Sequence, residues 1–159
     1  MHHCLRPSSR ISLVSRKKRN DVSKPSIIKQ DHVTGTVPMT YDEFNDYCRA
    51  LPATTHVVQW GNSDVWKVGG KVFAIGGWQK DEQPAFTFKT CDLDFEILKD
   101  QPGFRPAPYL ASRGMKWIQQ YGVTDTGDDD LRYYLRESHR LVSLGLTRKK
   151  QRELGLNTP

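Results

Sequence analysis

"DVWKVGGKVFAIGGW", residues 64–78, predicts two antiparallel strands joined by a tight turn. Hydrophobic and polar side chains alternate on both sides of a central Gly-Gly pair, which is a strong signal for a two-residue β-hairpin. In the register that this turn sets, Val68 faces Lys71 and Trp66 faces Phe73, an aromatic pair that would hold the register. The stretch therefore predicts the centre of an antiparallel sheet.

Three further segments have the pattern of strands. Residues 56–60 ("HVVQW") lie before the hairpin and end at a Gly-Asn turn. Residues 84–89 ("PAFTFK") follow it with alternating hydrophobic and polar side chains, and residues 115–121 ("MKWIQQY") are extended in the same way. Short strands joined by turns favour an antiparallel arrangement.

Three segments predict helices. Thr40 and Glu43 form a capping box that starts a helix over residues 41–51. Asp92 caps a second helix that ends at a Pro-Gly pair, and an acidic run favours the start of a third over residues 129–145. The third helix has a stripe of residues expected to be buried: Leu131, Tyr134, Leu135, Ser138 and Val142. The order of elements predicts a two-layer α+β domain, with helices packed on an antiparallel sheet.

The positive charge is concentrated near the N-terminus. The 159 residues carry a formal net charge of +6. Eight of the 24 Lys and Arg lie in residues 1–38 with two of the 18 acids, so residues 39–159 are formally neutral. Residues 1–38 have no hydrophobic period and are predicted to be a disordered basic extension. Three explanations of it stay open: a start codon upstream of a true first residue Met39, a targeting peptide, or a basic tail that binds phosphates or acts as a nuclear signal.

The folded domain is expected over residues 39–150, with a basic C-terminal tail end over residues 151–159. No apolar run approaches the roughly 20 residues of a membrane helix, so no membrane partner is expected. The cysteines Cys4, Cys48 and Cys91 are isolated and odd in number, which argues against a disulfide framework and favours a cytoplasmic location. No metal-ligand motif occurs, so neither a metal nor another cofactor is expected.

The segment "RPAPYLASRGMKW", residues 105–117, holds two prolines, two large aromatics and three cations without an acid. In one interpretation its cations bind phosphate oxygens while its aromatics stack on a base or a sugar. In the other, the prolines stiffen a crossover and the aromatics pack in the core. The residues concerned are Arg105, Tyr109, Arg113, Lys116 and Trp117.

Two other groups of cations are candidates for phosphate contacts. Lys67 and Lys71 flank the hairpin turn, as in a DNA-binding wing, although lysines near a sheet edge also discourage aggregation between strands. Arg148, Lys149 and Lys150 form the densest cation run of the folded part and are expected to be flexible. Both groups would supply affinity that does not depend on base sequence.

Three stretches that occur in order resemble the MmcQ/YjbR family: "MTYDEFNDYCRALP" from residue 39, "VWKVGGKVFA" from residue 65 and "QPGFRPAPYLASRGMKW" from residue 101. The resemblance covers residues 39–150. It implies the family's small α+β fold, described as a double wing and similar in shape to secretion-chaperone domains. It also implies the DNA-binding function with which members are commonly labelled. One departure lies at residues 112–115, where members often carry a histidine that this sequence lacks.

The basic clusters and the resemblance predict a non-enzymatic DNA-binding protein that contacts backbone phosphates with low sequence specificity. The alternative is a protein-interaction or chaperone-like adaptor, which exposure of Trp60, Trp78 or Trp117 on one apolar patch would favour. A third hypothesis is a small-molecule pocket beneath the crossover of residues 105–117. No catalytic residue is predicted, because no nucleophile-elbow, P-loop or dinucleotide-binding motif is present. The expected partner is therefore DNA or a protein.

Overall fold

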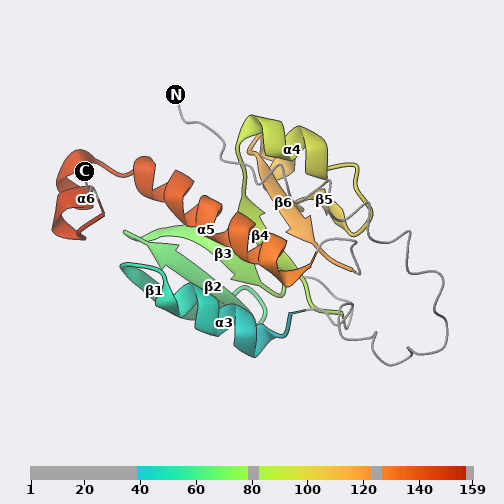
Figure 1. The fold of residues 1–159 in the computed structure, drawn as a ribbon, viewed down its shortest axis with the longest axis horizontal. Helices are drawn as coiled ribbons and strands as arrows, with labels where there is room; N and C mark the ends of the chain where they lie inside the picture. Colours follow the sequence, from blue (N-terminus) through green and yellow to red (C-terminus); the bar gives the residue numbers. More distant parts are fainter. Residues whose placement is uncertain (1–38, 79–82, 123–126, 157–159) are drawn as a thin grey trace, which may run out of the picture.

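The computed structural model describes residues 39–78, 83–122 and 127–156, which form one antiparallel sheet of six strands with helices packed on it (Figure 1). The strands are β1 (Thr54–Gln59), β2 (Ser63–Val68), β3 (Lys71–Gly76), β4 (Phe86–Lys89), β5 (Phe104–Pro106) and β6 (Trp117–Gln120). They lie in the order β1-β2-β3-β4-β6-β5, and every neighbouring pair is antiparallel. This confirms the predicted α+β class.

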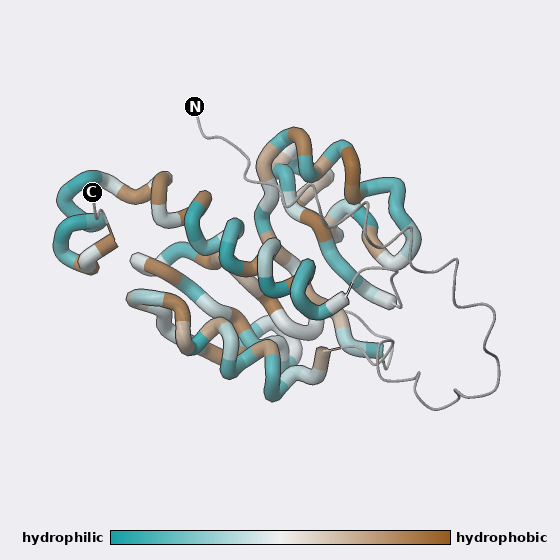
Figure 2. Tube along the Cα trace, viewed as in Figure 1, coloured by the Kyte–Doolittle hydropathy of each residue, from teal (hydrophilic) through white to brown (hydrophobic). Residues whose placement is uncertain are grey.

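The helices are α3 (Tyr41–Ala50), α4 (Asp92–Leu98), α5 (Asp128–Leu144) and α6 (Arg148–Glu153), with a short 3-10 helix, η2 (Ala111–Arg113). α3 packs on β1 and β3, α4 on β5 and β6, and α5 on β2, β3 and β4. Side chains of these three helices meet in one hydrophobic cluster, so the helices share one face of the sheet. Along α3 and α5, hydrophobic and hydrophilic residues alternate (Figure 2), as in helices with one buried face.

The opposite face of the sheet, here called the open face, is defined by the register of the strands. Side chains alternate between the two faces along each strand, and cross-strand partners share a face. Phe88 and Ile118 are partners that belong to the hydrophobic cluster under the helices. Ile75, Thr87 and Gln119, which also form a row of partners, therefore lie on the open face.

The hairpin is confirmed, but only one of its two predicted pairs is correct. Val68 pairs with Lys71, whereas Trp66 pairs with Ala74 and not with Phe73. The register shifts by one residue at this point, and the bulge leaves Phe73 and Ala74 both fully buried. Burial of two adjacent side chains thus outweighs the aromatic pair that the sequence suggests.

The helix starts follow the sequence with one correction. In α3 the capping box is present, because Thr40 Oγ1 accepts from Glu43 N and Glu43 Oε2 accepts from Thr40 N. The cap of α4 is Cys91, whose Sγ accepts from Asp94 N at 3.5 Å, and not Asp92. Cys91 is also disulfide-bonded, so the expectation of isolated thiols is wrong for this residue. The predicted stripe of α5 is buried along its whole length.

The C-terminal segment is helical and packs against the hairpin. The sequence predicts a flexible tail from Arg148, but Thr147 caps a helix there by accepting from Lys150 N. Leu146, just before this cap, is buried, and a Cβ added to Gly69 in the hairpin turn would lie 2.6 Å from its Cδ1. Glycine at this turn therefore admits Leu146, and the expected boundary after residue 150 falls inside α6.

The two edge strands differ in how open they are to further pairing. β5 ends at Pro106, whose nitrogen cannot donate a hydrogen bond to another strand. β1, at the other edge, has the sequence TTHVVQ, without proline or charged side chains, and its four central residues are exposed. The prolines of the crossover are therefore accommodated at and beyond a sheet edge.

The predicted extension of residues 1–38 lies outside the described residues. Within the part of the chain that the structure describes, no helix is both long enough and apolar enough to cross a membrane. The same part contains no cluster of three or more His, Cys, Asp or Glu side chains arranged to hold a metal ion.

Ser138 of α5 joins β3 and β4 at the point where the two strands separate. Their pairing covers three residues and ends at Ala74 and Phe88. Beyond that point the Ser138 hydroxyl donates to Phe73 O at 2.6 Å and accepts from Lys89 N at 2.9 Å. One buried side chain thus takes the place of a strand-to-strand hydrogen bond and holds α5 at the gap.

Ser138→Ala is expected to lower the free energy of unfolding by about 2–3 kcal/mol, because two buried backbone groups lose their partner. Ser143→Ala on the same helix is the matched control, since Ser143 is buried but its hydroxyl has no hydrogen-bond partner among the described residues. It is expected to change stability little. Urea denaturation of both variants measures the difference, and equal losses would contradict the bridging role.

Candidate functional site

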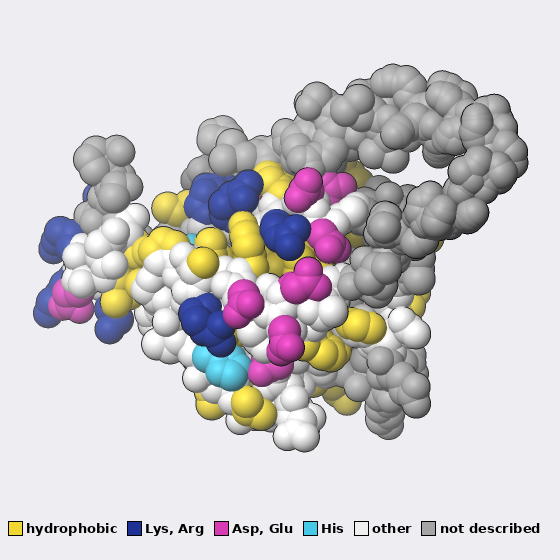
Figure 3. Space-filling model, turned by 60° about the horizontal axis from the view of Figure 1, so that its bottom comes forward, with side chains coloured by type: hydrophobic (Ala, Val, Ile, Leu, Met, Phe, Trp, Pro, Cys, Tyr) yellow, Lys and Arg dark blue, Asp and Glu magenta, His cyan; other side chains and the backbone are white. Residues whose placement is uncertain are grey.

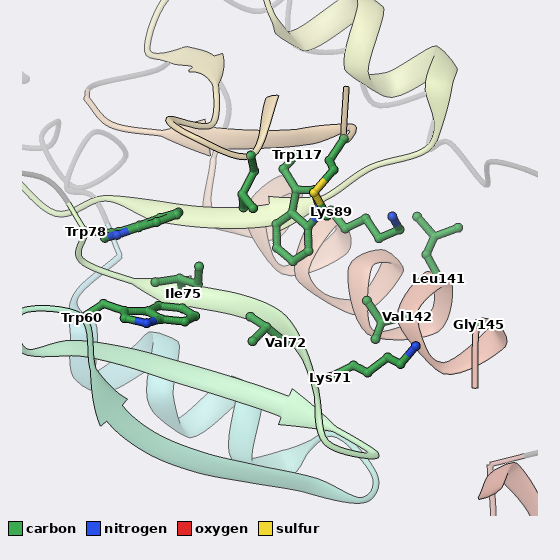
Figure 4. Close-up of a pocket in the computed structure, with 12 residues that line it drawn as sticks. Trp60, Lys71, Val72, Ile75, Trp78, Lys89, Trp117, Leu141, Val142 and Gly145 are labelled. Atoms are coloured by element: carbon green, nitrogen blue, oxygen red, sulfur yellow. The ribbon is translucent and has the colours of Figure 1, made fainter. Parts of the chain in front are cut away.

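A groove of about 490 Å³ lies on the open face of the sheet. It extends from the loops that follow β1 and β3 to the gap between β3 and β4, where α5 contributes to its floor (Figure 4). A concave site of this size with a mostly apolar lining is typical of ligand binding. The described lining residues are Trp60, Lys71, Val72, Ile75, Trp78, Lys89, Leu110, Met115, Trp117, Leu141, Val142 and Gly145.

The floor of the groove is aliphatic. Val72 and Ile75 come from β3, and Leu141 and Val142 come from α5. The two α5 residues reach the open face because β3 and β4 separate in front of them. They follow Ser138 by three and four residues, which is one helical turn. The hydroxyl that bridges the strands therefore also sets the position of the floor.

Three aromatic side chains form a row at one end of the groove, here called the aromatic row. The Trp60 and Trp78 rings stack with centroids 5.8 Å apart, and the Tyr109 ring lies 6.0 Å from that of Trp78. All three residues have left-handed backbones, with φ values of +54°, +70° and +68°. This conformation is uncommon for bulky residues and costs roughly 1–2 kcal/mol per residue. Such strain persists where surrounding contacts enforce it, and it gathers at binding sites.

Hydrogen bonds on the open face hold the aromatic row. Gln119 is fully buried, and its Nε2 donates to Trp78 O at 3.4 Å and to Thr87 Oγ1 at 3.2 Å. Arg105 donates from Nε and Nη2 to Gln119 Oε1, at 2.9 and 2.7 Å. The guanidinium of Arg105 also lies 4.3 Å from the centroid of the Tyr121 ring. Arg105 therefore supports the backbone that carries Trp78.

The ammonium groups of two lysines and the indole N–H groups of three tryptophans are the polar side-chain groups of the described lining residues. Lys71 and Lys89 extend toward α5 at the end of the groove away from Trp60 and Trp78 (Figure 4). Among the described residues, no carboxylate lies within salt-bridge distance of either ammonium group. Trp117 Nε1 is buried and has no acceptor in that part of the chain. The groove thus offers hydrogen-bond donors and net positive charge.

Burial shifts the pKa values of two titratable groups behind the sheet toward the neutral form. Burial lowers the pKa of His139 on α5, although its hydrogen bond with Pro52 O, at 2.8 Å, raises it in part. Burial raises the pKa of the Cys48 thiol, which lies in the core under α3. Among the lining residues, the positive charge comes from Lys71 and Lys89.

The structure brings some of the predicted site residues to this groove. Lys71 and Trp117 line it, and Tyr109 extends the aromatic row at its rim with 73% of its surface exposed. Lys67 lies on the same face, because it pairs with Val72, but it is not among the lining residues. The structural interpretation of the aromatics fits Trp117, which is 5% exposed, and does not fit Tyr109.

The other predicted cations lie apart from the groove. Lys116 lies on the helix side of the sheet, with Nζ 4.9 Å from the Phe95 ring centroid, so it points away from Arg105 on the open face. Arg113 is exposed on η2. The remaining three cations are exposed on α6: Arg148, Lys149 and Lys150.

Charges elsewhere on the surface are mixed. Figure 3 shows one side of the molecule, on which acidic side chains lie among Lys and Arg, while Lys and Arg gather at the end that carries α6. Ion pairs within helices account for part of the mixing, namely Arg49–Asp46 in α3 and Arg132–Asp129 in α5. The basic end at α6 is therefore the clearest concentration of positive charge on this side.

Sequence reasoning missed the β4 and α5 walls of the groove. Lys89 pairs with Trp117, which puts both on the open face, but that pairing has no signal in the sequence. The left-handed backbones of Trp60 and Trp78 are equally hidden, because Gly61 follows Trp60 and Gly77 precedes Trp78, and each glycine is sufficient to explain a turn. The sequence suggests only that the three tryptophans of the groove could belong to one exposed apolar patch.

The stacked Trp60 and Trp78 rings are expected to give an exciton couplet in the far-ultraviolet circular dichroism spectrum. Trp60→Phe and Trp78→Phe are each expected to remove it, because the coupling needs both indoles at close range. Trp117→Phe is the control, since Trp117 is not part of the stack, and it is expected to retain the couplet. A couplet that survives Trp60→Phe would contradict the stacking.

Comparison with known proteins agrees with the fold and with the family resemblance of the sequence. The family model of YjbR matches residues 49–141, more than half of the chain. The crystal structure of the Deinococcus radiodurans protein DR2400, which has a DUF419 domain, is similar with a TM-score of 0.61 and 25% identity, over 76% of this chain and 92% of that chain. No curated protein matches. The chain belongs to the YjbR family.

Proposed function

We propose that this YjbR-family domain is a non-enzymatic binding protein whose ligand lies in the groove on the open face. The observation that carries the proposal is the groove itself, with its volume of about 490 Å³ and its walls of strand, crossover and α5 side chains. A site of this size holds a drug-sized ligand, and three indoles offer a large apolar contact area. The proposal favours the small-molecule hypothesis drawn from the sequence, because the groove lies beneath the crossover of residues 105–117.

The chemistry of the lining supports a binding role over catalysis. Nucleophilic and acid–base catalysis use carboxylates, imidazoles, hydroxyls, thiols or lysine amines within reach of a substrate. Of these groups, the described lining residues carry only the amines of Lys71 and Lys89, with no carboxylate, imidazole, hydroxyl or thiol in the lining to act with them.

The uncharged fluorescent probe N-phenyl-1-naphthylamine is expected to bind the full chain with an increase in its fluorescence. Met115→Glu is expected to weaken binding at least about tenfold, because it puts a charge into an apolar site. Leu144→Glu is the matched control: both side chains are 41% exposed, but Leu144 is not among the lining residues. Equal effects of the two variants, or no binding of the probe, would contradict the proposal.

The adaptor hypothesis uses the same surface, with a segment of a partner protein in place of a small ligand. Exposed apolar side chains at the rim would contribute to such an interface, since Trp60 is 48% and Met115 41% exposed. We place the small ligand first because of the depth of the groove. It reaches through the sheet to α5, whereas an extended peptide needs only a shallow groove on the surface. A partner protein that displaces N-phenyl-1-naphthylamine from the chain would favour the adaptor.

Binding to DNA backbone is a second candidate, which α6 favours. Its cap at Thr147 places three consecutive exposed cations in a helix: Arg148, Lys149 and Lys150. Lys149 is 3.9 Å from Glu153, a weak exposed pair that leaves the cation accessible. Arg105 and Lys116 give this candidate less support, because they lie on opposite faces of the sheet and both contact aromatic rings of the fold.

Replacing Arg148, Lys149 and Lys150 together by glutamine is expected to reduce the slope of log affinity against log salt by about 3, one unit for each phosphate that the helix no longer neutralises. Fluorescence anisotropy of the full chain with a labelled DNA duplex measures this slope. The control replaces by glutamine three cations that already pair with acids: Arg49, Lys99 and Arg132. An unchanged slope in the α6 variant would contradict the role of α6.

A further inference from the structure

The groove has two chemically different ends, and together they specify a class of ligand. Trp60 and Trp78 mark the aromatic end, and Lys71 and Lys89 mark the cationic end beside α5 (Figure 4). We infer that the ligand is an alkyl carboxylate, a flexible apolar chain with one carboxylate head, and that the head lies near the two lysines. The inference rests on the proposed function, because it names the ligand class of the same groove.

The head group follows from the donors that lack acceptors. Lys71 and Lys89 line the groove and have no carboxylate partner within the described part of the chain. A carboxylate has two oxygens that accept several hydrogen bonds and no proton to donate. It would neutralise the positive charge that the lining leaves unbalanced.

The apolar body follows from the floor. Val72, Ile75, Leu141 and Val142 present branched aliphatic carbon along the groove between the two ends. A gap of 5.8 Å between the Trp60 and Trp78 centroids leaves no room for a further ring between them. A flexible alkyl chain can follow the floor and contact the edges of both indoles, and each added methylene that is buried strengthens binding roughly fourfold.

A structural role for the two lysines is the competing explanation. They lie beside Leu141, Val142 and Gly145 at the carboxyl end of α5, where positive charge stabilises a helix. In that role they would affect the stability of the fold and would not distinguish a carboxylate from an alcohol. Measuring head-group preference and thermal stability on the same variants therefore separates the two roles.

The test is isothermal titration of the full chain at pH 7.5 with decanoate, decanol, decyl phosphate and decyltrimethylammonium, each below its micelle concentration. Decanoate is expected to bind at least about tenfold more tightly than each of the others, and about fifteenfold more tightly than octanoate. The double variant Lys71→Met with Lys89→Met is expected to lose about tenfold in decanoate affinity and to keep its affinity for decanol. Lys67→Met, on the open face but outside the lining, is the control and is expected to change neither affinity.

Each contrary result has a distinct meaning. Decanol that binds as tightly as decanoate would overturn the carboxylate head and leave the apolar groove standing. Tighter binding of decyl phosphate would overturn the choice of carboxylate in the same way. A double variant that loses thermal stability but keeps the preference for decanoate over decanol would assign the lysines to α5. If neither decanoate, decanol nor N-phenyl-1-naphthylamine binds, both the inference and the proposed function fail.

Discussion

The hydrogen bonds of Ser138 to two strands are the constraint on which the groove depends. A continuous ladder between β3 and β4 would close the sheet and leave no hollow, but their pairing stops after three residues. The Ser138 hydroxyl satisfies the carbonyl of Phe73 and the amide of Lys89, so the strands separate without leaving these buried groups unpaired. Leu141 and Val142 are then within reach of the open face. The hollow exists because a helix side chain replaces a strand partner.

Both ends of the crossover of residues 105–117 help to form the groove, which explains why cations and aromatics share one segment. Arg105 holds Gln119, which in turn donates to the backbone of Trp78. At the other end Trp117 forms part of the wall. The strain at the aromatic row is offset by this support and by ring stacking. Arg105 therefore stabilises the shape of the groove without being one of its lining residues.

Most of the elements and the family can be predicted from the sequence, but little of the groove can. Capping residues and hydrophobic periods act locally, so α3, the hairpin and α5 are predictable. The bulge that sets Trp66 opposite Ala74 is not, because it depends on burial by helices distant in sequence. Among the candidate residues, Lys71, Trp117 and Tyr109 lie at the groove, although the sequence suggests them for phosphate binding. Their meeting with Lys89 and α5 depends on the order of strands, which no local pattern encodes.

The contrast between the two edge strands limits how copies of this sheet can join. β5 has three residues and ends in Pro106, so it can form few hydrogen bonds with a strand of another copy. β1 is longer, uncharged and exposed. Growth into a filament needs two different edges that accept each other in turn. With one edge blocked, union through β1 is self-complementary and stops at a two-fold pair. A single proline therefore limits edge-to-edge assembly of this sheet to a dimer.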